Sequence, residues 1–93
     1  MAKLNGNLRI TATSGAEGGK PYFEVVFIPY AGRLNTKPAR ASTYEELVDL
    51  LKELKFDEDT ATHWSGRARS QGIVLISSFE RNESFLRECG LIG

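Results

Sequence analysis

The chain has 93 residues, of which 41% are hydrophobic and 26% charged, and its 12 basic and 12 acidic side chains cancel. This length and composition predict one soluble globular domain with a modest core. The single cysteine excludes an internal disulfide and a multi-cysteine metal site. The longest apolar runs, Val25–Ile28 and Ile73–Ile76, are too short to span a bilayer, and the start lacks a secretory apolar core. We therefore expect a cytoplasmic protein with no membrane association.

The charges are sorted along the chain although they cancel overall. Residues 1–42 carry six basic and two acidic side chains, residues 43–59 carry two basic and seven acidic ones, and residues 60–93 carry four basic and three acidic ones. A domain with its charges divided in this way has faces of opposite sign, which steer partners even at zero net charge. The sequence therefore predicts charged interaction surfaces.

Two strands are predicted in the first third of the chain. Leu8, Ile10 and Ala12 alternate with polar residues, which indicates a half-buried strand. Three glycines between residues 14 and 19 predict a turn. The segment Tyr22–Tyr30 is rich in β-branched and aromatic residues and is apolar on both of its faces, so it predicts a strand within a sheet or against a second layer. The two strands most simply form an antiparallel hairpin.

The first helix has the clearest signals in the chain. Residues 31–42, which precede it, predict an irregular loop because they show no periodicity. Thr43 and Glu46 have the spacing of a capping box, in which each side chain satisfies a backbone donor at the helix start. Ser42 and Glu45 offer the same box one residue earlier, so the sequence leaves two positions for the first residue of the helix. Apolar residues then recur at helical spacing as far as Leu54.

A second helix is predicted from an Asp57 cap to a Gly72 terminator. Gly66 lies in its middle, where glycine costs about 1 kcal/mol relative to alanine. That cost predicts either a break in the helix or another element packed closely against the glycine.

The last two elements complete the fold prediction. Ile73–Phe79 opens with four consecutive apolar residues, which predicts a central strand covered on both faces. Asn82 is placed to cap a closing helix that ends at Gly90. The predicted order is β-β-α-α-β-α, an α/β (α+β) two-layer sandwich with a small three-stranded, mainly antiparallel sheet and three helices.

The second apolar face of Tyr22–Tyr30 predicts self-association. If all helices pack on one side, this face stays wet, although burying each large apolar side chain is worth about 1.5–3 kcal/mol. We therefore expect a homodimer through the sheet. The alternative is that helices cover both faces. The side chains in question are Tyr22, Val26, Ile28 and Tyr30.

The function that this pattern favours is a small non-enzymatic protein-interaction or regulatory module that presents a charged surface to a protein partner. The surface we expect to make the contact is the acidic face of the first helix. The ordinary alternative is a solvated helix face whose charges only favour capping. The residues of the predicted face are Glu45, Glu46, Asp49 and Glu53.

An alternative hypothesis is nucleic-acid binding through a basic loop and two helix arginines. Trp64 would then stack on a base, although its register also fits a core anchor. Balanced net charge counts against this class, because dedicated binders usually carry a basic excess. The residues that would contact phosphates are Arg33, Lys37, Arg40, Arg67 and Arg69.

A third hypothesis is a small enzyme with a site shared across a dimer. His63 stands one turn after Asp59 and one turn before Arg67, so an aspartate could orient the imidazole as a general base. An exposed surface ion pair explains the same spacing. Cys89 lies at the carboxyl end of the last helix, which raises a thiol pKa and disfavours a nucleophile. No nucleotide loop or metal-ligand spacing stands out, so neither a cofactor nor a metal site is predicted.

Overall fold

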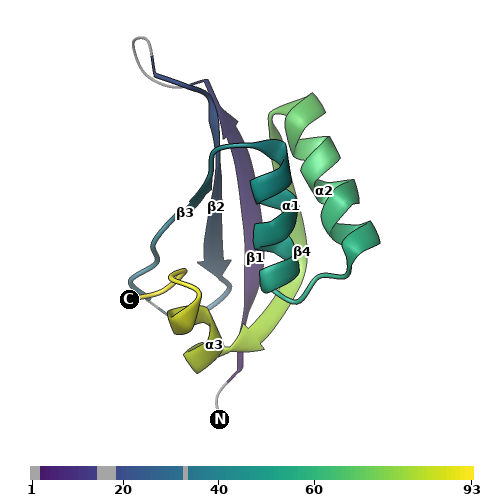
Figure 1. Cartoon of the computed structure of the whole chain (residues 1–93). Helices are drawn as coiled ribbons and strands as arrows, with labels where there is room; N and C mark the ends of the chain where they lie inside the picture. The colour runs from purple at the N-terminus through teal and green to yellow at the C-terminus, as the bar shows by residue number, and fades with distance from the viewer. Residues whose placement is uncertain (1–2, 15–18, 33) are drawn as a thin grey trace.

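The computed structural model of the chain describes residues 3–14, 19–32 and 34–93 (Figure 1). The described strands form one antiparallel sheet in the order β3-β2-β1-β4. The predicted two-layer arrangement of strands and helices is confirmed, but the sheet has four strands instead of three. The elements are β1 (Lys3–Thr13), β2 (Tyr22–Pro29), β3 (Ala39–Ala41), α1 (Tyr44–Glu53), α2 (Glu58–Gln71), β4 (Ile73–Asn82) and α3 (Glu83–Glu88).

The additional strand is β3, which falls within the predicted irregular loop. It has three residues and pairs with β2 through Phe23 and Ala41, Glu24 and Arg40, and Val25 and Ala39. Three residues are too few to show a period-two pattern, and the pairing that makes them a strand comes from elsewhere in the chain. The prediction of three strands was wrong for this reason.

The position predicted for β4 was also wrong. In the described sheet β4 pairs with β1 alone and forms an edge. Val74 and Ile76 are 5% and 7% exposed, whereas Ile73 and Leu75 are 56% and 51% exposed. The apolar run is therefore covered on one face only.

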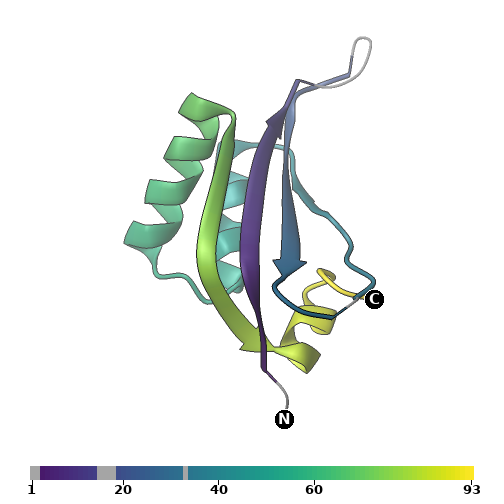
Figure 2. The same ribbon diagram turned by 180° about the vertical axis from the view of Figure 1, so that it is seen from behind.

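The helices lie on one face of the sheet, as the two opposite views show (Figures 1 and 2). The predicted caps of both long helices are present: the side chain of Thr43 accepts a hydrogen bond from the amide of Glu46, and that of Asp57 accepts one from Thr60. Gly72 ends α2 with a φ of 86°, in the left-handed region that favours glycine. Among the described helices, none is long and apolar enough to cross a membrane.

The core fills the space between this sheet face and the helices. It includes Phe27 from β2, Leu47 and Leu51 from α1, and Leu86 from α3. Trp64 packs against it partly buried, which confirms the core-anchor interpretation of that residue.

Both expectations for Gly66 were wrong. Helix α2 runs without interruption from Glu58 to Gln71, and a β-carbon added at Gly66 would meet nothing within 4 Å. Neither a helix break nor a close neighbour therefore explains the glycine.

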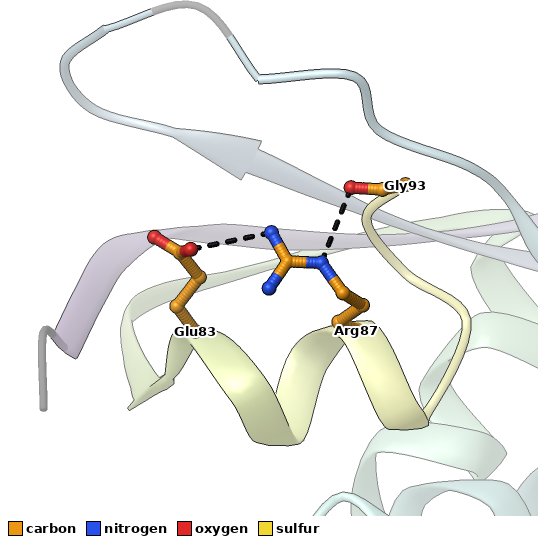
Figure 3. Close-up of polar contacts among 3 residues, drawn as sticks. All are labelled: Glu83, Arg87 and Gly93. Atoms are coloured by element: carbon orange, nitrogen blue, oxygen red, sulfur yellow. Dashed lines mark hydrogen bonds and ion pairs between the residues drawn. The ribbon is translucent and has the colours of Figure 1, made fainter.

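The segment after α3 returns to the loop before β3. The amide of Gly93 donates to the carbonyl of Asn35 at 2.7 Å, and the amide of Lys37 donates to the carbonyl of Leu91 at 2.9 Å. Arg87 links the first residue of α3 to the segment after that helix. Its guanidinium lies 3.2 Å from the Glu83 carboxylate and 3.4 Å from the Gly93 carbonyl (Figure 3). These contacts place Lys37 beside the segment that follows α3.

Candidate interaction surfaces

The sheet face opposite the helices carries a mixed apolar and polar surface. The register places Arg9 of β1 between Val26 and Leu75, and Thr11 is paired with Ile73 on the same face. Paired residues share a face because side chains alternate along a strand. We call this surface the open sheet face. It comprises Asn7, Arg9, Thr11, Tyr22, Glu24, Val26, Ile28, Tyr30, Ile73 and Leu75.

The exposure of these residues shows whether helices cover both faces of the sheet or only one. Ile73, Leu75 and Tyr30 are each more than half exposed, while Val26 and Ile28 are half-buried. None of the three described helices covers this face in either view (Figure 2). The alternative in which helices cover both faces is therefore wrong.

The polar side chains at the two ends of the open sheet face are already engaged. At one end, the Tyr30 hydroxyl donates to the Asn7 carbonyl oxygen at 2.7 Å and accepts from the Ser78 amide at 2.8 Å. At the other end, Glu24 lies 3.7 Å from the Arg40 guanidinium. Within the described residues, Arg9 in the middle has no ion pair of this kind.

The predicted acidic face of α1 divides into two parts. Glu46 takes part in capping α1, because its carboxylate accepts a hydrogen bond at 2.6 Å from the amide of Ser42, the residue before the Thr43 N-cap. Glu45, Asp49 and Glu53 repeat every four residues, are exposed, and form no ion pair within the part of the chain that is described. We call these three residues the acidic stripe.

The predicted basic residues do not form one surface. Lys37 lies in the loop that pairs with the segment after α3, and Arg67 is exposed on α2. Arg33 lies outside the described residues. Arg40 and Arg69 each stack on a tyrosine: Arg40 lies 4.8 Å from the centroid of the Tyr22 ring and Arg69 lies 4.1 Å from that of Tyr44.

The two tyrosines line a common hollow, which sequence reasoning missed. It lies where the β1–β2 end of the sheet meets the start of α1 and the last turn of α2, and its volume is about 350 Å³. We call it the tyrosine groove. Its polar and aromatic lining comes from Lys20, Tyr22, Ser42, Thr43, Tyr44 and Arg69.

The residues considered for catalysis lie apart. His63 is exposed, and its ring contacts that of Trp64 edge to face at 5.0 Å. Among the described residues, no ion pair joins it to Asp59 or Arg67. Ser65 on the same helix is buried, so the two side chains point in different directions.

Cys89 is partly buried against the core, as expected of a small apolar residue. Burial raises the pKa of its thiol, and the nearby Glu53 and Glu88 carboxylates raise it further. The predicted direction is confirmed, with burial as the largest cause. No group of three or more potential metal ligands occurs within the described ranges.

No protein family, curated protein or solved structure matches this chain.

Proposed function

We propose that the protein is a non-enzymatic interaction module that pairs with a second copy of itself through the open sheet face and presents the acidic stripe to a protein partner. The observation that carries the proposal is the open sheet face. It exposes half or more of Ile73 and Leu75 on β4, and the half-buried Val26 and Ile28 of β2 lie on the same face, on the other side of Arg9 of β1. Exposed apolar surface that is rimmed by polar residues marks association sites in soluble proteins.

The size of this face supports a second copy as the occupant. A strand spacing of about 4.8 Å and a rise of about 3.3 Å per residue give the sheet a flat face of roughly 500 Å². Two copies would therefore bury about 1,000 Å² or more in total, which reaches the lower bound for a specific interface. A self-complementary contact also needs no other molecule to cover the apolar residues.

The charges on the face suit a two-fold contact. Arg9 is paired with Val26, and Glu24 is the next residue on that side of β2, so the two charges are diagonal neighbours. A two-fold axis lying in the interface between them exchanges their positions and sets Arg9 of each copy opposite Glu24 of the other. The contact would then place an ion pair on each side of the axis.

Light scattering of the full chain tests the self-association. We expect a dimer for the natural chain and a monomer for Leu75→Asp, because the substitution would bury a charge in the interface. Thr62→Asp, an equally acidic change on the exposed surface of α2, is the matched control and should remain dimeric. A natural chain that stays monomeric at high concentration contradicts the homodimer.

The acidic stripe supports the second half of the proposal. Glu45, Asp49 and Glu53 are like charges at four-residue spacing, which costs a helix about 0.2–0.5 kcal/mol per pair. None of the three carboxylates forms an ion pair with a described Lys or Arg. A basic protein surface would do so, and dimerisation through the opposite face of the sheet leaves the helix accessible.

Cross-linking of partners in cells tests the stripe. The triple variant Glu45→Gln, Asp49→Asn and Glu53→Gln should lose partners that the natural chain retains. A control with the same change in net charge, made at Glu58, Glu80 and Glu88, should keep them. If both variants recover the same partners as the natural chain, the stripe is not the docking surface.

A further inference from the structure

The tyrosine groove contains unused positive charge. Lys20 and Arg69 both line it, and neither forms an ion pair within the described residues. No carboxylate is among its described lining residues. The carboxylate of Glu46 accepts a hydrogen bond from the amide of Ser42, a lining residue, at 2.6 Å. The hollow therefore offers two cations to an incoming anion.

Arg69 is oriented for such an anion. Its guanidinium stacks 4.1 Å from the Tyr44 ring centroid, and within the described part of the chain its N–H groups form no hydrogen bond. Stacking fixes the guanidinium plane and leaves its edge available, and that edge matches two oxygens of a phosphate. Part of the ordering cost of binding is thus met before the ligand arrives.

The rest of the lining suits a flat ring. Tyr44 contributes an aromatic wall, and Pro21 and Phe23 extend the apolar surface. Tyr22 also lines the hollow, although its register places it with the open sheet face and Arg40 stacks on its ring. A volume of about 350 Å³ is at the lower end of small-molecule sites.

We infer that the tyrosine groove binds a single 5′-phosphorylated nucleotide, with the phosphate at Arg69 and Lys20 and the base against Tyr44 and Phe23. The same chemistry occurs in a free mononucleotide and at the 5′ end of a strand. The inference does not depend on the proposed self-association, because Lys20, Phe23, Tyr44 and Arg69 all lie outside the open sheet face.

Nuclear magnetic resonance titration of the full chain with adenosine 5′-monophosphate tests the inference. We expect saturable shifts of the Lys20, Tyr22 and Tyr44 amides with a Kd on the order of 1 mM or below. Adenosine, which lacks the phosphate, and inorganic phosphate, which lacks the ring, should each bind about tenfold more weakly or worse.

Two arginines of α2 provide a matched pair of variants. Arg69→Gln should weaken the mononucleotide about tenfold, since it removes a charge-assisted bidentate contact. Arg67→Gln makes the same change two residues away, outside the lining, and should leave the affinity unchanged. Lys20→Gln gives a second lining variant on a different element, and it should weaken binding as well.

The outcomes separate cleanly. Equal weakening of mononucleotide binding by Arg67→Gln and Arg69→Gln would mean non-specific charge attraction. Inorganic phosphate that binds as tightly as the mononucleotide would mean that the aromatic rings contribute nothing. Either result overturns the inference.

A 5′-phosphorylated trinucleotide distinguishes the two sources. If it competes with the mononucleotide at the same amides, the site also accepts strand ends, and if it does not compete, the site binds free nucleotides alone. Loss of dimerisation in Leu75→Asp with unchanged nucleotide binding would keep the two proposals distinct.

Discussion

The two faces of the sheet are built from the same strands but differ in what the fold does with their apolar side chains. On β2, Val25 and Phe27 are fully buried under the helices, whereas Val26 and Ile28 on the other face are half-buried. On β4, the same alternation leaves Ile73 more than half exposed. The apolar side chains of the helix-covered face are buried within one chain, whereas the open sheet face leaves an excess of exposed apolar surface. That excess is what we attribute to association.

The largest expected effect tests this difference between the two faces at adjacent residues of β2. Phe27→Ala removes a fully buried ring that contacts the Phe79 ring at 5.9 Å between centroids, and it should lower the free energy of unfolding by about 3–5 kcal/mol. Val26→Ala, one residue away on the open sheet face, should cost the monomer about 1 kcal/mol or less. Urea unfolding at a concentration where the chain is monomeric measures both.

Equal costs for the two substitutions would contradict the comparison. They would mean that the open sheet face contributes as much as the helix-covered face to the stability of one chain. The excess apolar surface would then need no partner.

The next effect concerns the one arginine on the helix-covered side of β4. Arg81 donates through Nε to the carbonyl of Leu54, the C-cap of α1, at 2.8 Å. Its guanidinium lies 4.4 Å from the Phe79 centroid and 5.3 Å from that of Phe56. Burial lowers the pKa of Arg81, but guanidinium stays charged at neutral pH.

We expect Arg81→Met to destabilise the fold by about 2 kcal/mol, since it leaves a helix-end carbonyl without its charged donor while preserving apolar volume. Thermal unfolding followed by circular dichroism measures the change. Arg87→Met, at a more exposed arginine that also contacts a carbonyl and a carboxylate, is the control and should cost less. A loss at Arg81 no larger than at Arg87 would show that the buried contact contributes little.

The parts of the fold that were predicted from sequence depend on local chemistry. Thr43 with Glu46, and Asp57 with Thr60, make their hydrogen bonds within one turn, so residue spacing indicated both helix starts; for α1 it left Ser42 and Thr43 as alternative caps, and the structure has Thr43. The edge position of β4 and the existence of β3 depend on which strands lie side by side. A continuous apolar run such as Ile73–Ile76 does not distinguish a strand covered on both faces from a strand with one exposed face.

The candidate sites show the same division. The acidic stripe was predictable because Glu45, Asp49 and Glu53 lie on one helix at a fixed spacing. The tyrosine groove joins Tyr22 with Arg69, which are far apart in sequence, and no local pattern links them. The available signal was weaker: two tyrosines near the ends of predicted elements, each a possible platform for an arginine.

A smaller effect is expected within the helix layer that covers the sheet. Gly66 lies inside α2 with space for a methyl group, so Gly66→Ala should stabilise the fold by about 0.5–1 kcal/mol through helix propensity. The midpoint of urea unfolding measures it. Gly72→Ala is the matched control: the same change at a φ of 86° should destabilise. A loss of stability at Gly66 would indicate a contact that only glycine permits.

The smallest effect depends on pH and concerns the cap of the same helix. Hydrogen bonds from the side chain and the backbone amide of Thr60 lower the pKa of the Asp57 carboxyl below its ordinary value. The folded state therefore binds this proton less readily than the unfolded state. The stabilisation is complete above the ordinary carboxyl range near pH 4 and is lost as the pH falls through the lower folded pKa of Asp57.

Asp57→Asn keeps a capping oxygen but removes the titration. The difference in unfolding free energy between the natural chain and the variant should therefore be constant at neutral pH and shrink below about pH 4. Asp59→Asn removes a carboxylate of the same first turn that forms no such hydrogen bond among the described residues, and it is the control for the loss of one acidic charge. If the plots of unfolding free energy against pH for the natural chain and Asp57→Asn run parallel down to the lowest pH, the Asp57 cap does not contribute to acid sensitivity.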